Sequence, residues 1–275
     1  MMKNAILAYL SPNRSTRHVA LVIQKALADT GTAAPLAGDL SRDADRLAVL
    51  EAIQGEENPL LIIGSPVYRD LAVPPVMRFI DGLPPAKGGR AAVFATWGGA
   101  NSGLALWQMA GALNAKGYAV MGAAKVLGVH SMMWTEAAPV GAGRPNAEDD
   151  AQVAAWARKL AAANGQPLSL EALRYQGEDF EKSVLERIDA PWAIIPKSID
   201  PEACTACGTC ASVCPVEAIA MDPGPVFGAA CFDCFNCIRE CPEEAISPAM
   251  PLAKIGAKIR ERVAAFDEQP PTQVW

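Results

Sequence analysis

The residues best suited to chemistry are eight cysteines, which form two runs with the same spacing, C-x2-C-x2-C-x3-C-P. The first run contains Cys204, Cys207, Cys210 and Cys214, and the second contains Cys231, Cys234, Cys237 and Cys241. Thiolates are ligands for soft metal centres. A zinc site normally takes four ligands in two pairs rather than two runs of four. A disulfide framework is typical of short secreted chains, whereas this chain has 275 residues. The two runs therefore indicate thiolate-ligated metal centres.

The repeated run resembles that of bacterial two-cluster ferredoxins, which hold two [4Fe–4S] clusters. A cubane cluster offers four iron corners, and three cysteines two residues apart surround three of them, while the fourth cysteine faces away and ligates the other cube. We therefore expect cluster I on Cys204, Cys207, Cys210 and Cys241, and cluster II on Cys231, Cys234, Cys237 and Cys214. The sequence after each run repeats as well, C-P-V-E-A-I and C-P-E-E-A-I, which predicts a short helix and a short strand in each half.

The chain before the cysteines alternates between apolar runs and amphipathic segments. Strands are expected at 3–10, 33–37, 59–64, 90–96 and 118–129. Helices are expected at 17–29, 43–54, 74–81, from 103 to about 116, and at 148–163. Five β-α units predict an α/β fold, a doubly wound five-stranded parallel sheet with helices on both faces.

In such a sheet, ligands bind beyond the carboxyl ends of the strands, where the strand order reverses. Loop 11–16 is rich in hydroxyl groups and opens a helix, so it suits an anion, although a Ser/Thr helix cap explains it equally well. Loops 65–73 and 97–103 carry Tyr68 and Trp97 beside glycine and proline. Aromatic faces with backbone partners suit a flat ring, although either aromatic alone could be a packing residue.

These loops make residues 3–165 resemble a flavodoxin-like domain that binds FMN, and the whole chain resembles the flavodoxin-domain/ferredoxin-domain fusion proteins. Family members read S-P-T-G-N-T-x-x-V-A in the first loop, and residues 11–20 here read S-P-N-R-S-T-R-H-V-A. The resemblance implies FMN binding by Ser11, Asn13, Arg14, Ser15, Thr16, Pro66, Val67, Tyr68, Trp97, Gly98, Gly99, Asn101 and Gly103. Two departures are Arg14 in place of a glycine, and Asp70-Leu71 where the family commonly has Gly-Arg.

We expect four parts: a flavodoxin-like domain at 1–165, a linker at 166–199, a ferredoxin domain with two [4Fe–4S] clusters at 200–247, and a helical tail at 248–275. The linker has helical segments at 169–173 and 178–188, and its apolar stretch 192–196 should pack against a domain. The tail reads as an amphipathic helix over 251–266, and residues 269–275 are expected to be loose unless Trp275 is anchored.

Charge and hydropathy restrict the partners. The whole chain has a net charge of −6, and the negative charge is concentrated in residues 200–246, which contain eight acidic residues and one arginine, a net of −7. Such a surface favours a basic redox protein as partner. No basic stripe indicates nucleic acid, and no apolar run has the length of a signal peptide or membrane span. We expect a cytoplasmic protein, and two copies could pair head to tail as a homodimer.

Three functions are compatible with these features. The main hypothesis is electron transfer between the two [4Fe–4S] clusters and FMN, to or from a redox partner. The alternative is an FMN-dependent reductase of a quinone, an enone or a nitro compound, fed by the clusters. A third hypothesis is a flavin-free module in which Arg14 has abolished FMN binding. No catalytic residue is predicted, although Tyr68 could donate a proton, and we expect neither His18 nor His130 to be catalytic.

Overall fold

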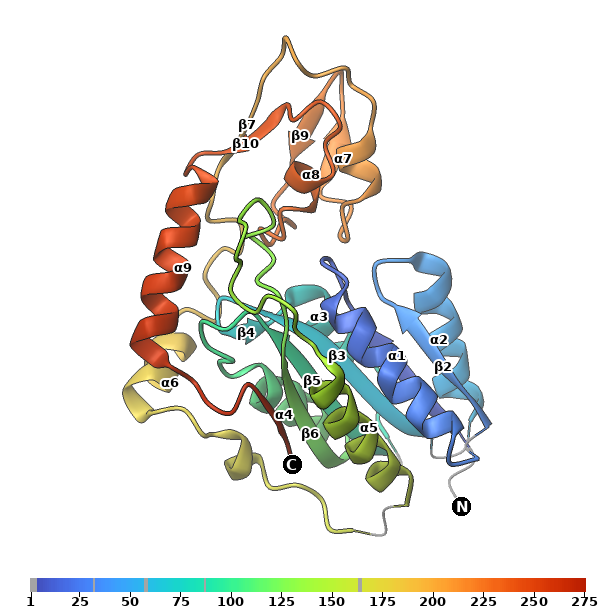
Figure 1. Cartoon of the computed structure of the whole chain (residues 1–275). Helices are drawn as coiled ribbons and strands as arrows, with labels where there is room; N and C mark the ends of the chain where they lie inside the picture. The colour runs from blue at the N-terminus through green and yellow to red at the C-terminus, as the bar shows by residue number, and fades with distance from the viewer. Residues whose placement is uncertain (1–3, 32, 57–58, 87, 163–164) are drawn as a thin grey trace.

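A computed structural model describes residues 4–31, 33–56, 59–86, 88–162 and 165–275. The chain folds into a larger α/β body and a smaller cysteine-rich body, which lies at the top of Figure 1. A long helix, α9 (Leu252–Phe266), runs along one side from the small body down to the large one, before the C-terminus enters the sheet (Figure 1).

The α/β body is built on the five predicted parallel strands. They are β1 (Asn4–Tyr9), β2 (Ala33–Asp39), β3 (Leu60–Tyr68), β5 (Arg90–Trp97) and β6 (Ala119–Leu127). Their spatial order is β2-β1-β3-β5-β6, and every neighbouring pair is parallel. This is the flavodoxin-like order, whose switch point lies between the first and third strands. The prediction of a doubly wound parallel sheet is confirmed.

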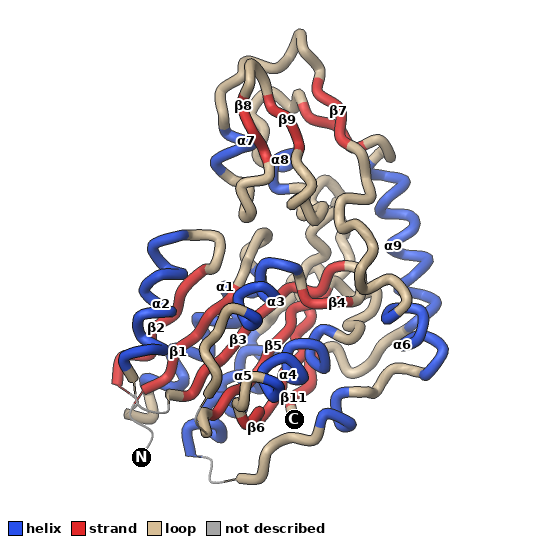
Figure 2. Tube along the Cα trace, turned by 180° about the vertical axis from the view of Figure 1, so that it is seen from behind, coloured by secondary structure: helices blue, strands red, loops and turns tan. Residues whose placement is uncertain are grey.

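Helices cover both faces of the sheet because side chains alternate along each strand. The helices are α1 (Ser15–Ala28), α2 (Asp43–Gly55), α3 (Pro74–Asp81), α4 (Ala105–Ala115) and α5 (Ala147–Ala162). Leu7 and Tyr9 of β1 face the core that α1 and α5 close, whereas Ile6 and Ala8 face the core closed by α2, α3 and α4. Figure 2 shows the strands between these two helix layers.

The sheet has two strands that the sequence did not predict. β4 (Leu71–Ala72) pairs with the end of β3, and β11 (Thr272–Val274) pairs antiparallel with β6 at the edge of the sheet. The last residues are therefore not loose. Trp275 is anchored because its backbone exchanges hydrogen bonds with Ala123, and its ring stacks on Tyr175 with centroids 5.2 Å apart.

The cysteine-rich body has the predicted repeat of a short helix and a short strand. Its helices are α7 (Thr209–Ser212) and α8 (Asn236–Arg239), and its strands are β7 (Lys197–Ile199), β8 (Ile219–Met221), β9 (Pro225–Phe227) and β10 (Ile246–Pro248). β8 pairs with β9, and β10 returns to pair with β7.

The linker packs against the α/β body in part: of the apolar stretch 192–196, Trp192 packs against its core, whereas Ile194 is 58% exposed, contrary to the prediction. It contains a 3-10 helix, η1 (Leu170–Leu173), and α6 (Glu178–Leu185), and it buries Leu173 and Val184. Within the described residues, none of the helices has both the length and the apolar character needed to cross a membrane.

Candidate functional site

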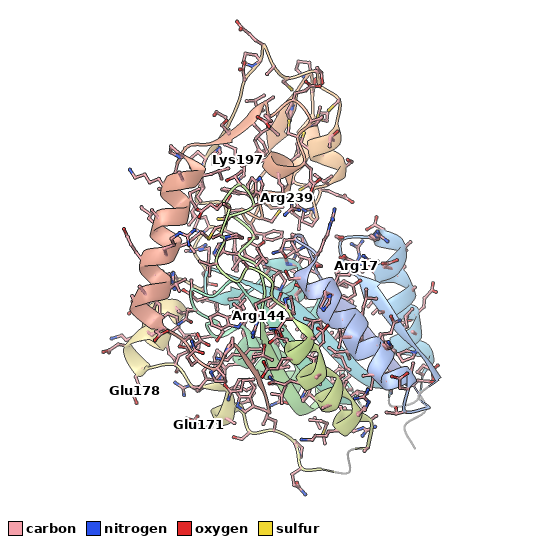
Figure 3. The ribbon with its side chains drawn as sticks, viewed as in Figure 1. Arg17, Arg144, Glu171, Glu178, Lys197 and Arg239 are labelled. Carbon is pink, nitrogen blue, oxygen red and sulfur yellow. The ribbon has the colours of Figure 1, made fainter. Side chains whose placement is uncertain are left out.

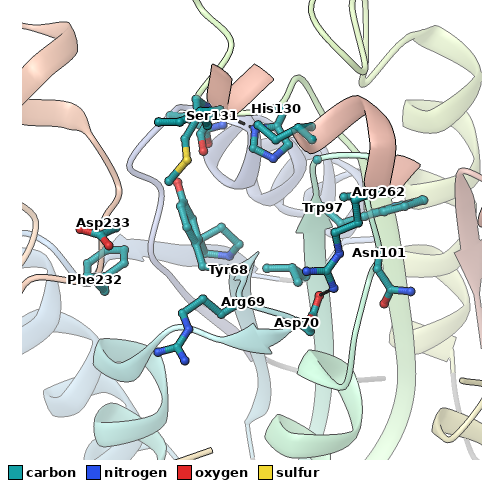
Figure 4. A pocket seen from close by; sticks show the side chains of 18 of the residues that line it. Tyr68, Arg69, Asp70, Trp97, Asn101, His130, Ser131, Phe232, Asp233 and Arg262 are labelled. Carbon is teal, nitrogen blue, oxygen red and sulfur yellow. Dashed lines mark hydrogen bonds and ion pairs between the residues drawn. The ribbon is translucent and has the colours of Figure 1, made fainter. Parts of the chain in front are cut away.

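A cavity of about 450 Å³ opens at the carboxyl edge of the sheet, beside the switch point. The loops after β1, β3, β5 and β6 form its floor, and the cysteine-rich body and α9 supply the remaining walls. Figure 4 shows Tyr68 in this cavity, with Phe232 and Asp233 on one side and Arg262 on the other. The three predicted loops therefore come together at one site.

Loop 11–16 contributes Asn13 and Ser15 to the cavity. The Asn13 amide nitrogen donates to the Val129 carbonyl at 3.3 Å, while its buried Oδ1 has no hydrogen-bond partner among the described residues. Arg14 adopts a left-handed conformation with φ of 73°, and its side chain is exposed.

Two other residues of this loop make internal hydrogen bonds and are not in the cavity wall. The buried Thr16 hydroxyl lies 2.7 Å from the Thr96 hydroxyl. The Ser11 hydroxyl accepts from the Arg17 backbone N–H at 2.9 Å, a capping role at the start of α1.

Loop 65–73 places Pro66, Val67 and Tyr68 in the cavity wall. The Tyr68 hydroxyl is buried and forms no well-aligned hydrogen bond within the described ranges; burial raises the pKa of Tyr68 above its usual value, and the nearby Ser131 side chain offsets part of this shift. Arg69 and Asp70 both have positive φ, 52° and 70°, which is the conformation of a two-residue hairpin turn between β3 and β4.

The departure at Asp70 has a structural consequence. Its carboxylate is nearly buried and accepts from the Arg262 guanidinium at 2.6 Å and from Arg187 at 3.4 Å. Arg262 belongs to α9 and Arg187 to the linker, so the hairpin fastens both segments over the cavity.

Loop 97–103 contributes Trp97, Gly98 and Asn101 to the wall. The Trp97 indole donates to the Pro271 carbonyl at 2.9 Å, so this ring also fixes the C-terminal segment. Asn101 Oδ1 accepts from the Gly103 N–H at 2.6 Å.

The two remaining predicted glycines of this loop shape its backbone. Gly103 has φ of 61° and lies so close to the Asp70 carbonyl that a Cβ there would be 2.0 Å from the oxygen. Gly99 also has positive φ, 85°, and a Cβ there would lie 2.5 Å from the Val140 side chain. Gly99 does not line the cavity.

The loop after β6 was not among the predicted site loops. Residues 128–132 line the cavity, and a Cβ on Gly98 would lie 2.7 Å from the His130 ring. Burial lowers the pKa of His130 to about 4, so the ring is neutral near pH 7. The sequence could have indicated this loop as part of the site, because it follows the carboxyl end of the fifth strand.

The roof of the cavity comes from distant parts of the chain. Ile255, Lys258, Ile259 and Arg262 face it from α9, with Trp192, Ile194 and Ile195 from the linker. These α9 positions are three or four residues apart and therefore share one helix face. The amphipathic character of 251–266 was visible in the sequence, but its target was not.

The second cysteine run itself forms part of the cavity wall. Phe232 and Asp233 lie between Cys231 and Cys234, and the Phe232 ring meets the Tyr68 ring edge-on with centroids 5.7 Å apart. The residues of a predicted cluster loop and of a predicted flavin loop are therefore in direct contact.

Asp233 fixes this loop to the linker. Its carboxylate accepts from the Ile194 and Ile195 N–H groups at 2.7 and 2.9 Å, and from the buried Lys197 ammonium at 2.5 Å. Lys197 also lies 3.5 Å from the Cys231 sulfur. Burial opposes the charge of Lys197, but its bonds to Asp233 raise its pKa overall.

Four of the eight cysteines line one small cavity. This enclosed cavity in the cysteine-rich body is lined by the four cysteines expected for cluster II, namely Cys214, Cys231, Cys234 and Cys237. Cys210 and Cys241, both expected for cluster I, share one apolar cluster with Cys214 and Cys237, both expected for cluster II, so this cluster joins the two cysteine runs. All eight cysteines are free thiols.

This arrangement fits thiolates spread over the four corners of a cubane. Among the described residues, no three His, Cys, Asp or Glu side chains converge closely enough to hold one metal ion. Burial raises the pKa of both Cys234 and Cys237 to about 12, so cluster assembly has to displace their protons.

The family of 4Fe-4S binding domains matches residues 197–220, which include the whole first cysteine run. The small body is a ferredoxin-type domain that binds a [4Fe–4S] cluster. Since such clusters transfer electrons, the match indicates a redox role. With the strand order of the sheet, it shows that the chain joins a flavodoxin-like α/β domain to a ferredoxin-type domain.

Several solved structures are similar to the α/β domain. A flavodoxin from the domain Archaea is 19% identical, with a TM-score of 0.45, over 58% of this chain and 96% of its own. A short-chain flavodoxin associated with a bacterial microcompartment is 15% identical, with a TM-score of 0.44, over 58% of this chain and 98% of its own. The rubredoxin oxygen:oxidoreductase of the anaerobe Desulfovibrio gigas is 20% identical, with a TM-score of 0.46, over 63% of this chain and 37% of its own. No curated protein matches the chain.

Proposed function

We propose that this chain is an electron-transfer protein that holds FMN in the cavity and two [4Fe–4S] clusters in the two cysteine runs. The observation that supports this most directly is the contact between Tyr68 and Phe232, because it joins the flavin cavity to the loop of cluster II. When bound, the clusters supply one-electron transfer and FMN supplies one- or two-electron transfer.

The cavity fits FMN in size and in chemistry. Its volume of about 450 Å³ and its largely apolar wall are typical of a cofactor pocket. One buried polar atom in its wall, Asn13 Oδ1, lacks a partner among the described residues and is available to a ligand. Asn13 and Ser15, at the N-terminus of α1, would hold the phosphate. Tyr68, with the backbone of Gly98, would hold the ring.

The second cluster is supported by the grouping of the cysteines. Cys214 belongs to the first run, yet it lines the same cavity as the three leading cysteines of the second run. This exchange of the fourth ligand is the arrangement of two-cluster ferredoxins.

External redox partners would meet the protein at cluster I. Cys207 is exposed, and so are Glu202, Glu243 and Glu244 of the same domain. A basic redox protein would be attracted to this acidic surface, and its association rate would fall with ionic strength.

Anaerobic purification followed by acid release tests the proposal. Iron, sulfide and FMN are counted per chain, and eight irons with one FMN are expected. Four irons would exclude the second cluster. Eight irons with no FMN, even after FMN is added, would exclude both flavin-dependent functions and leave a module in which only the clusters work.

A flavin-dependent reductase is the second candidate, and the Tyr68 hydroxyl favours it. This hydroxyl lies in the cavity wall, where it would meet a small substrate and could donate a proton to it, although burial raises its pKa and makes it a weaker acid. Steady-state reduction of quinones, enones and nitro compounds distinguishes the two functions. A reductase would turn over one of these classes, and Tyr68→Phe would lower the turnover per bound FMN.

A further inference from the structure

One arginine of the ferredoxin-type domain reaches into the flavodoxin-like domain. Arg239 ends α8, between Cys237 and Cys241, and Figure 3 places it where the two bodies meet. Its guanidinium Nη2 donates to the Pro12 carbonyl at 3.1 Å. Pro12 belongs to the loop between β1 and α1, one residue before Asn13.

The position of Arg239 is fixed by both cysteine runs. The same Nη2 donates to the Asn236 side-chain oxygen at 2.8 Å. The Asn236 amide in turn donates to the Val213 carbonyl at 3.4 Å, next to Cys214. Asn236 is buried, so this chain of hydrogen bonds connects the two cluster loops to loop 11–16.

We propose that Arg239 is a positioning residue for the FMN phosphate and that it couples FMN binding to the assembly of the clusters. This inference rests on the proposed function. The Arg239 Nε donates to the Glu240 carboxylate at 3.0 Å, while its Nη2 holds the Pro12 carbonyl and thereby orients Asn13 and Ser15 toward a phosphate beside this loop. Where cluster loss releases Arg239, the loop loses this support, so FMN affinity falls.

Coupling of this kind is reciprocal, so bound FMN also retains the clusters. Allosteric coupling between two sites typically changes affinity about 5- to 150-fold. The ferredoxin-type domain touches the cavity at a second place, where Phe232 meets Tyr68. The Arg239 contact lies at loop 11–16, which would hold the phosphate, and the Phe232 contact lies at Tyr68, which would hold the ring. Comparing FMN, which carries a phosphate, with riboflavin, which does not, therefore distinguishes the effects of the two contacts.

The test titrates flavin-free protein containing eight irons with FMN and with riboflavin, following quenching of flavin fluorescence. Arg239→Gln should weaken FMN by at least about fivefold and leave riboflavin within about twofold, below the range of such coupling. Arg239→Lys, which keeps the charge, should recover part of the FMN affinity. Phe232→Leu should weaken both ligands equally. Arg158→Gln, on the surface of α5, is the matched control and should change neither affinity.

The reciprocal arm measures the rate of iron loss to a chelator with and without saturating FMN. FMN should slow iron loss in the wild-type protein and should have no such effect in Arg239→Gln. Where Arg239→Gln does not retain eight irons, Arg239→Lys replaces it in both arms, with a smaller loss of FMN affinity expected.

Equal FMN affinity in wild type and Arg239→Gln, or a parallel loss of FMN and riboflavin affinity, would overturn the inference and leave the proposed function intact. Failure of the wild-type protein with eight irons to bind FMN would instead reject the proposed function itself.

Discussion

Arg14 is a residue whose backbone conformation conflicts with its side chain. Its φ of 73° lies in the left-handed region, where a side chain with a Cβ costs about 1–2 kcal/mol. The side chain is exposed, and the loop around it is held by the Arg17 N–H donating to the Ser11 hydroxyl and by the hydrogen bond between the Thr16 and Thr96 hydroxyls. The surrounding turn therefore imposes a conformation that glycine would adopt without cost. The family that the chain resembles has glycine at this position.

Arg14→Gly is expected to raise the free energy of unfolding of the α/β domain by about 1 kcal/mol, because the left-handed strain is removed. Urea unfolding followed by tryptophan fluorescence measures it. Arg17→Gly is the matched control, since Arg17 lies within α1, and glycine in a helix should cost about 1 kcal/mol. A destabilised Arg14→Gly would show that the side chain makes a contact worth more than the strain.

His130 makes stability depend on pH. Burial holds its pKa at about 4, against 6.5 for the free side chain, so the unfolded chain binds a proton at higher pH than the folded chain does. The stabilisation is present above pH 6.5 and is lost as the pH falls toward 4, by up to about 1.4 kcal/mol between pH 8 and pH 5.5. Urea midpoints at those two pH values should differ in this direction, and His130→Gln should reduce the difference. An unchanged difference would assign it to other groups.

At the scale of elements, the parallel strands and their helices followed from local pattern. Apolar runs such as 60–63 and 91–95 are fully buried, and a continuous apolar run is the signature of a strand covered on both faces. β11 could not be predicted in this way because three residues after two prolines are too few to show an alternation of apolar and polar side chains. Its existence depends on pairing with β6 and on hydrogen bonds from Trp97 and Trp156.

The site shows the same division. Strand order brings loops 11–16, 65–73 and 97–103 together, so their meeting was predictable from topology. The roof was not, because Ile255 and Arg262 are distant in sequence from the loops that they cover. Thr16 and Gly103, predicted as flavin contacts, have structural roles in the loops: the Thr16 hydroxyl pairs with Thr96, and Gly103 leaves room for the Asp70 carbonyl.

The buried pair between β6 and the C-terminal segment should dominate the stability of the sheet edge. Lys125 is 1% exposed, and its ammonium lies 2.5 Å from the Glu268 carboxylate. Glu268→Gln leaves a buried cation without its partner, so it should cost about 3–5 kcal/mol. Asp43→Asn breaks the exposed Asp43–Arg46 pair and should cost no more than about 1 kcal/mol. Thermal unfolding of the two variants compares them, and equal costs would contradict the role of burial.

At the scale of the whole molecule, the ferredoxin-type domain is inserted between parts of the flavodoxin-like domain. The chain leaves the sheet after α5, builds the cysteine-rich body, and returns through α9 to add β11 to the same sheet. A division at residue 165 therefore separates β6 from its edge strand. The two domains share the cavity at the carboxyl edge of the sheet, and the returning segment fastens them together through Arg262 and Asp70.

A fragment of residues 1–165 should consequently be less stable than the α/β domain of the full chain by more than about 3 kcal/mol, because it exposes the edge of β6 and strips Lys125 of Glu268. Urea unfolding by tryptophan fluorescence measures the difference. A peptide of residues 251–275 added in trans should restore part of it, since it supplies Glu268, β11 and Trp275 together. The same peptide with Glu268→Gln should restore less. A fragment as stable as the full chain would show that the returning segment only covers the cavity, whereas rescue by the peptide would show that the C-terminal segment completes the fold and joins the two domains.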